Sequence, residues 1–190
     1  MQPLDILSNL PTIETERLLL RKITLNDAND MFEYGSDPLV SQYTMWSTHT
    51  SIEDTKSFLR SLTKMYKKRE LIDWGIVHKS EQKLIGTCGY VEWSMNHSRA
   101  QIGYALSRKY WNQGYMSEAV SAIIEFGFRE MSLNKIEARC AQENIASARV
   151  MEKVGMQLEG ILKQHLFVKD TYWNLKIYGI LREDFFDELM

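Results

Sequence analysis

Hydrophobic and polar positions along the chain follow two different periods, which divide it into strands and helices. Apolar and β-branched runs bounded by turn-forming residues predict strands. These runs occupy residues 17–23, 73–78, 83–93, 99–106, 135–140, 157–167 and 171–181. Apolar residues at helical spacing predict helices over residues 24–34, 52–69, 116–131 and 145–154. This order is typical of a mixed α/β domain and differs from the regular βαβαβ alternation of a Rossmann sheet.

Local signals mark the ends of several elements. Thr24, followed three residues later by Asp27, predicts a helix cap. Short, turn-rich connections join the three strands in the middle of the chain, which favours an antiparallel meander. Residues 169–170 are expected to form the turn between the last two strands. We expect residues 1–14 to be a loose lead-in and residues 15–185 to form one domain.

Composition narrows the class of protein. The formal net charge is −2 and the pI is about 6.1, which argues against a protein that binds nucleic acid through a basic surface. No apolar run is long enough for a membrane span, and the first residues do not resemble a secretory signal, so we expect a cytoplasmic location. Cys88, Cys140 and the four histidines show no metal-ligand spacing, so we expect no metal.

The loop before the helix at residues 116–131 is the most informative local feature. It follows a strand and opens a long helix, so it presents free backbone N–H groups and the positive end of the helix dipole. Gly114 lets the backbone approach a ligand closely, and Ser117 adds a hydroxyl. An anion site is one interpretation of this loop. The other is that Gly114 only permits a turn and that Ser117 only caps the helix.

Three stretches together resemble the GNAT superfamily of N-acetyltransferases. Residues 110–119 read YWNQGYMSEA and are similar to its acyl-CoA pyrophosphate loop. Met116 and Glu118 depart from the general pattern, but they fit a branch that resembles the Rim-type N-terminal acetyltransferases of ribosomal proteins, which act on alanine or serine. Residues 15–21 (TERLLLR) and 144–156 (NIASARVMEKVGM) are similar to two further motifs of that branch. The resemblance implies a single-domain GNAT fold, with a mixed, mostly antiparallel sheet flanked by helices.

The resemblance also implies acetyl-CoA as the co-substrate, without a metal. The strand around residues 103–107 is expected to diverge from the next strand and to bind the pantetheine arm through its backbone. Asn144 is expected to bind the same arm, and Ser147 to assist the leaving thiolate; a helix cap and an ordinary first-turn serine are the alternatives. Arg149 and Lys153 can face the CoA phosphates or simply solvent. The residues implied in acetyl-CoA binding are Leu106, Ser107, Gln113, Gly114, Tyr115, Met116, Ser117, Asn144 and Ser147.

The general base is less evident. Many relatives carry glutamate where this chain has Gln101, and an amide cannot accept a proton at neutral pH. Glu92 is our first candidate because its strand neighbours that of Gln101, although a solvated strand-face charge explains it as well. His165 and Glu159 are weaker candidates. An α-amino group needs only modest base catalysis, because its pKa is about 7.7–8.0.

The amine groove is expected between the early helices and the last strand pair. The side chains assigned to it are Trp46, Tyr90, Glu92, Gln101, Tyr104 and Tyr172, with Trp93 and Trp173 nearby. The leading hypothesis is direct acetyl transfer to the α-amino group of a ribosomal-protein N-terminus. Transfer to a small amine (a polyamine, amino sugar, antibiotic or amino acid) and a non-catalytic acyl-CoA sensor remain alternatives. A monomer and a homodimer are both compatible with the sequence, and no nucleic acid or membrane partner is expected.

Overall fold

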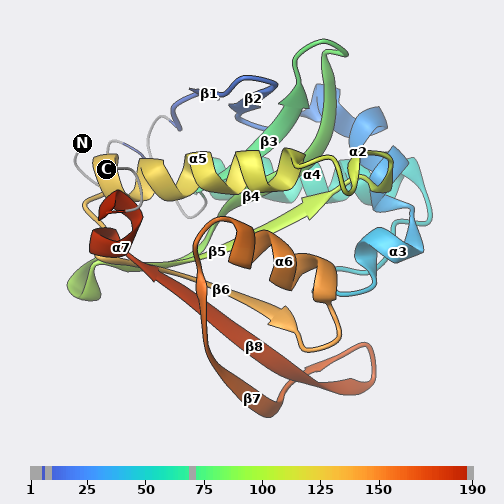
Figure 1. Cartoon of the computed structure of the whole chain (residues 1–190). Helices are drawn as coiled ribbons and strands as arrows, with labels where there is room; N and C mark the ends of the chain where they lie inside the picture. The colour runs from blue at the N-terminus through green and yellow to red at the C-terminus, as the bar shows by residue number, and fades with distance from the viewer. Residues whose placement is uncertain (1–5, 7–9, 69–71, 188–190) are drawn as a thin grey trace.

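One mixed sheet runs through the molecule (Figure 1). The computed structural model describes Ile6 and residues 10–68 and 72–187. Within these residues the sheet has eight strands in the order β1-β2-β3-β4-β5-β6-β8-β7. The strands are β1 (Ile13–Glu14), β2 (Leu18–Arg21), β3 (Ile72–His78), β4 (Lys83–Ser94), β5 (Arg99–Leu106), β6 (Lys135–Ala141), β7 (Gln157–Val168) and β8 (Thr171–Leu181). Neighbouring strands are antiparallel except β5 and β6, which are parallel.

Helices cover both faces of this sheet. In Figure 1, α5 and α6 lie in front of the sheet, and α4 lies behind it. The helices are α2 (Ala28–Gly35), α3 (Pro38–Ser41), α4 (Ile52–Lys68), α5 (Tyr115–Glu130), α6 (Ile145–Lys153) and α7 (Arg182–Asp187). One buried cluster joins α5 and α6 to the sheet, and a second joins α2 and α4 to its other face. The expected fold, a mixed and mostly antiparallel sheet flanked by helices, is confirmed.

The two parallel strands separate part of the way along their length. β5 pairs with β6 only from Arg99 opposite Lys135 to Ile102 opposite Ala138. Beyond this point β5 stays paired with β4, and β6 stays paired with β8. The divergence expected around residues 103–107 is therefore confirmed, and it opens toward the right of Figure 1.

The first segments differ from expectation in their boundaries. Ile6 is fully buried and residues 13–14 form β1, although we expected residues 1–14 to be loose. The predicted strand over residues 17–23 is shorter, because β2 ends at Arg21. The helix expected from residue 24 begins as a 3-10 turn over residues 25–27, before α2.

Two short helices, α3 and α7, were not anticipated. The predicted end of α4, at Arg69, lies outside the described residues. For α3 a signal was present, since Asp37 accepts a hydrogen bond from the Leu39 N–H (3.0 Å) and Pro38 follows it. The chain also continues into α7 after β8. Among the described residues, no helix is both long enough and apolar enough to cross a membrane.

Candidate active site

Backbone groups of β5 face the gap between the diverging strands. The Ser107 N–H donates to the Ile85 carbonyl of β4 at 2.7 Å. Backbone groups alternate sides along a strand, so Tyr104 and Leu106 must face the opposite way, into the gap. The Leu106 carbonyl accepts a hydrogen bond from the Trp111 indole N–H at 2.8 Å. The N–H groups of Tyr104 and Leu106 and the Tyr104 carbonyl therefore face the gap. Ser107 was expected to bind the cofactor, but its N–H is already bonded to β4.

The loop that ends at the N-terminus of α5 lies beside this gap. Asn112 and Gly114 both adopt left-handed backbone conformations, with φ of 60° and 81°. Gly114 is the N-cap of α5. Because glycine has no side chain to cap the helix, it leaves the first N–H groups of α5 available to an external acceptor. The Gln113 side chain turns back and donates to the Lys109 carbonyl at 2.8 Å. The Gln113 side chain is therefore already hydrogen-bonded within the loop, which leaves the backbone of this residue to contact a ligand.

The two departures from the general loop pattern have structural roles. Met116 is buried in the core beneath α5, so its side chain does not obstruct the loop. The Glu118 carboxylate accepts hydrogen bonds from the Thr15 hydroxyl (2.6 Å), the Arg17 backbone N–H (2.9 Å) and Arg17 Nε (2.6 Å). Burial raises the pKa of Glu118, but these donors outweigh it and the net pKa is lowered. Glu118 therefore anchors the segment before β2 to the first turn of α5.

Two cations flank the loop. A Cβ built on Gly114 would lie 3.5 Å from Arg17 Nη2 and 3.8 Å from Lys153 Nζ. Arg17 Nη1 also donates to the Gln113 carbonyl at 3.0 Å, and its guanidinium stacks over the Tyr115 ring. Together with the free helix N-terminus, these charges suit a diphosphate. Sequence reasoning had considered Lys153 but not Arg17, although Arg17 lies within the TERLLLR stretch.

The start of α6 lies across the gap from Tyr104. The Tyr104 hydroxyl donates to the Ser147 carbonyl (3.0 Å) and lies 2.9 Å from Ser147 Oγ. Asn144 caps the helix, because its side-chain oxygen accepts from the Ser147 N–H at 3.1 Å. The cap leaves the Asn144 NH₂ group as a donor. Both alternatives for Asn144, a cap and a ligand contact, are therefore compatible with this geometry.

Cys140 contacts the same serine but is not a nucleophile in this environment. Burial raises the pKa of Cys140 to about 11, although Lys176 and a hydrogen bond with Ser147 lower it in part. The group is therefore a neutral thiol near pH 7, and thiolates are the nucleophilic form. This agrees with direct transfer rather than an acyl-enzyme.

The opposite face of the sheet carries Gln101 and its neighbours. Glu92 stands opposite Gln101 in β4, and Glu137 stands opposite it in β6. Arg99 lies between the two acids, 3.7 Å from Glu92 and 3.1 Å from Glu137. Gln101 Oε1 is buried without a hydrogen-bond partner among the described residues. Glu92 itself is exposed and ion-paired, so its environment does not favour a general base.

Asp73 is a residue that sequence reasoning missed. It lies on β3 opposite Gly89, which lies opposite Gly103 of β5. Burial raises the pKa of Asp73 to about 7, and a hydrogen bond from the Trp74 N–H lowers it in part. The sequence offered no local signal, because an acid at the start of a strand is ordinary and its neighbours depend on distant pairing.

The residues assigned to the groove are only partly brought together. Tyr90 lies in the core, where its hydroxyl donates to the Ile123 carbonyl of α5, so it cannot line a groove. Trp46 packs near His49 (5.4 Å between ring centroids) over the face that carries Gln101. Tyr172 is exposed and packs at a tilt against Phe167 near the tip of the β7–β8 hairpin, with 4.9 Å between the ring centroids.

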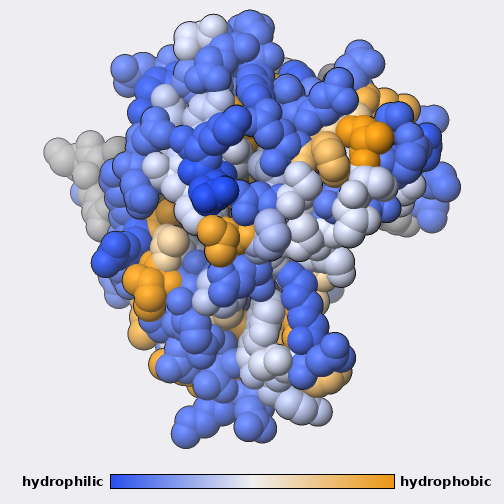
Figure 2. Space-filling model, turned by 90° about the vertical axis from the view of Figure 1, so that its right-hand side faces the viewer, coloured by the Kyte–Doolittle hydropathy of each residue, from blue (hydrophilic) through white to orange (hydrophobic). Residues whose placement is uncertain are grey.

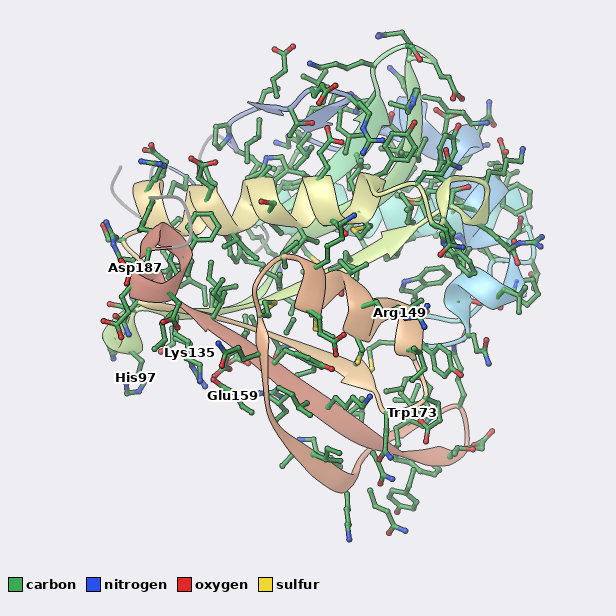
Figure 3. All side chains as sticks on the ribbon, viewed as in Figure 1. His97, Lys135, Arg149, Glu159, Trp173 and Asp187 are labelled. Carbon is green, nitrogen blue, oxygen red and sulfur yellow. The ribbon has the colours of Figure 1, made fainter. Side chains whose placement is uncertain are left out.

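The hairpin that carries Tyr172 touches the segment around α3. Lys169 Nζ donates to the Ser41 carbonyl at 2.5 Å, and the rings of Trp173 and Tyr43 lie 6.2 Å apart. Figure 3 shows Trp173 and Arg149 on the side onto which the strands open. Figure 2 looks onto this side, where mostly hydrophilic residues surround isolated hydrophobic ones.

The two weaker base candidates lie elsewhere on the last strands. Glu159 pairs with Lys135 at 2.8 Å, at the paired end of β5 and β6 rather than the open end (Figure 3). His165 is exposed on β7, in the irregular stretch between Leu162 and Leu166. Neither position favours contact with a group bound in the gap.

Two hollows differ in their relation to the gap. Tyr34, Trp46, Phe58, Thr87 and Ala105 line a cavity of about 20 Å³ on the Gln101 face, room for about one water molecule. A wider hollow of about 520 Å³ lies between β1 and the outer side of α5 and is lined by several acids. The described residues contain no group of three or more His, Cys, Asp or Glu side chains placed to hold a metal ion.

Comparisons with known proteins agree on the family. Residues 17–157 match the family model described as acetyltransferase (GNAT) domain. The chain is 34% identical over 172 residues to the uncharacterized N-acetyltransferase YoaA of Bacillus subtilis, covering 90% of this chain and 97% of YoaA. It is similar to a crystal structure of a GNAT-family acetyltransferase from Bacillus anthracis, with a TM-score of 0.81, 35% identity and coverage of 91% and 99%.

A more limited similarity concerns a protein with a named substrate. The chain is 31% identical over 99 residues to the ribosomal-protein-serine acetyltransferase of Escherichia coli, covering 52% of this chain and 55% of that protein. The family match spans most of the described sheet, the α5 loop and α6. The chain therefore belongs to the GNAT acetyltransferase family and is an N-acetyltransferase.

Proposed function

We propose that this protein transfers an acetyl group from acetyl-CoA directly to the α-amino group of a protein N-terminus. One arrangement carries the proposal: the backbone groups of Tyr104 and Leu106 face a gap between an α5 loop suited to a diphosphate and the Ser147 hydroxyl. A CoA molecule needs these three features in this order, because its diphosphate, pantetheine arm and sulfur follow one another. The similarity to the ribosomal-protein-serine acetyltransferase supports a ribosomal N-terminus as the acceptor.

In this mechanism each part of the chain has one task. The first-turn amides of α5, with Arg17 and Lys153, bind the diphosphate. The gap-facing N–H of Tyr104 is a donor for the carbonyl oxygen, which gains charge as the amine attacks. The amine nitrogen bonds to the carbonyl carbon and loses a proton, and the carbon–sulfur bond breaks. The Ser147 hydroxyl is placed to give a proton to the departing thiolate.

The gap also defines the two directions of approach. Tyr104 and α6 lie on the α5 face, and Gln101 lies on the opposite face, because successive side chains alternate along β5. The acetyl donor therefore enters from the α5 and α6 side and the amine from the α2 and α4 side. This separation keeps the leaving group away from the incoming amine.

The proposal is tested by following free thiol released from acetyl-CoA. The acceptors are short peptides with free α-amino groups, the same peptides with acetylated N-termini, and a panel of polyamines, amino sugars and amino acids. We expect release with the free peptides and none with the blocked ones. Faster release with a small amine than with every peptide would refute the assignment of the acceptor. Tight CoA binding without release by any amine would favour a sensor.

A further inference from the structure

The Asp73 carboxylate, on the amine side of the sheet, leans toward the gap. Asp73 of β3 lies opposite Gly89 of β4, and Gly89 lies opposite Gly103 of β5. Asp73 Oδ1 lies 2.6 Å from the point that a Cβ on Gly89 would occupy. The carboxylate therefore projects over β4, into space that exists because residue 89 is a glycine.

The way from this carboxylate to the gap is short. Adjacent strands are about 4.8 Å apart, so a group over β4 lies one strand from β5. Gly103 carries no side chain, and a Cβ there would meet only Val91, at 3.0 Å. The gap opens immediately after Ile102, so Gly103 is the first β5 residue beside it. Water molecules over Gly103 would link the carboxylate to an amine at the gap.

Asp73 lacks the partners that neutralise the other acids of this face. Among the described residues it forms no ion pair, whereas Glu92, Glu137 and Glu159 each contact a cation. Its hydrogen-bond donor is the Trp74 N–H. An unpaired, partly buried carboxylate is costly, so it is a candidate for a chemical role rather than for stability.

The groups around Asp73 come from three elements. Tyr66 of α4 donates its hydroxyl to the Asp73 carbonyl at 2.5 Å. Burial raises the pKa of Tyr66, of Tyr34 in α2 and of Cys88 in β4 well above neutrality, and the Asp73 charge raises each pKa further. All three therefore stay neutral near pH 7. The Arg21–Asp27 ion pair lies beyond Tyr66 and is internally balanced.

We propose that Asp73 is the general base of the reaction and occupies the role that Gln101 cannot fill. This inference rests on the proposed acetyl transfer to an amine. The amine nitrogen forms its bond to the acetyl carbon and passes one proton to the Asp73 carboxylate through the intervening water. The sulfur leaves as a thiolate and takes one proton from Ser147, which regains a proton from solvent, and Asp73 later releases its proton to solvent. The raised pKa of Asp73, about 7, suits a base that works near neutral pH.

The test compares Asp73→Asn with Asp184→Asn, the same chemical change on exposed α7. Asparagine keeps an oxygen that can accept the Trp74 N–H, so the fold is retained. With the peptide that releases most thiol, we expect kcat of Asp73→Asn to fall by about 100-fold or more while the KM for acetyl-CoA stays unchanged. In a plot of kcat against pH, the rise near pH 7 shown by the wild-type protein should be absent from Asp73→Asn. Asp184→Asn should match the wild-type protein.

A second series separates base catalysis from a merely structural loss. Acceptors with amines of decreasing basicity need less help to lose a proton, so the defect of Asp73→Asn should shrink along the series. An equal loss with every acceptor would refute a base. Retention of both the rate and the rise near pH 7 in Asp73→Asn would also overturn the inference, as would loss of that rise in Glu92→Gln instead.

The outcomes distinguish this inference from the proposed function. If a small amine is acetylated and no peptide is, the assignment of the acceptor fails, and the same comparison of variants is made with that amine. If peptides are acetylated and Asp73→Asn behaves like wild type, only the assignment of the base fails.

Discussion

Replacing Asp73 by asparagine should stabilise the protein at neutral pH, and the gain should grow with pH. Burial raises the pKa of the folded-state carboxyl from 3.8 to about 7. Between these values the folded protein keeps the proton and the unfolded chain releases it. Unfolding then releases a proton, so the free energy of unfolding of the wild-type protein decreases as pH rises through this window. Asparagine does not titrate and removes this decrease.

The size of the effect follows from the shift. About three pKa units at 1.36 kcal/mol each give an upper bound of roughly 4 kcal/mol above pH 7. Asp73 retains some solvent exposure, and screening reduces such figures, so we expect roughly 1–3 kcal/mol. The substitution also changes hydrogen bonds, which adds an amount to the stability difference that does not vary with pH. The change of this difference with pH, rather than its size at one pH, is therefore the diagnostic quantity.

Asp27 offers a control of opposite sign. Its carboxylate is buried, pairs with Arg21 Nη2 at 2.6 Å and accepts the Thr24 N–H at 2.7 Å. Burial raises the pKa of Asp27, but Arg21 and Thr24 outweigh it and the net pKa is lowered. Its stabilisation is present above the unfolded-state pKa and is lost as pH falls through the folded-state pKa. Asp27→Asn should therefore cost about 3 kcal/mol at pH 7 and progressively less in acid.

Urea unfolding followed by tryptophan fluorescence, at intervals from about pH 5 to pH 8, measures these differences. The stability of Asp73→Asn minus that of wild type should increase across this range and level off above about pH 7. A constant difference would show that the Asp73 carboxyl titrates normally in the folded state. A decrease with pH would show that Asp73 is paired with a cation and would refute the reasoning.

Three further changes test other parts of the site. Ser147→Ala should lower kcat by about 10–100-fold without changing the KM of the amine, and steady-state kinetics showing an unchanged kcat would exclude proton donation by Ser147. Glu118→Gln should weaken CoA binding by about tenfold in calorimetry, because charge-assisted bonds to Thr15 and Arg17 are lost, and an unchanged affinity would contradict the anchoring role. Gln101→Glu should not increase kcat at neutral pH, and a large increase would mean that a base is missing at that position.

The sequence predicts the order and type of most elements, because their signals are local. Apolar spacing within a helix and short turns between strands do not depend on distant residues, and the helices and the central meander follow from them. The short α3 was missed although Asp37 and Pro38 mark its start. The diverging strands were expected only from the resemblance, because the register of β5 with β6 is set by pairing between distant segments.

The direction of a side chain was harder to predict than its strand. Tyr90 and Glu92 are two residues apart and would share one face of a regular strand. A register shift between them places Tyr90 opposite Ile102 and Glu92 opposite Gln101, so the two face opposite sides. One irregular residue therefore moved Tyr90 into the core and left Glu92 on the amine side.

The charges around Gln101 explain why an acid is unfavourable there. Glu92, Gln101 and Glu137 stand side by side on three adjacent strands, and Arg99 is within reach of both acids. A glutamate at position 101 would add a third carboxylate to this row, and like charges directly opposite one another are destabilising. Its pKa would rise, and it would compete with its neighbours for Arg99. A base on this face therefore works better outside this row of residues. Asp73 lies outside it, over Gly89 and one strand from the gap.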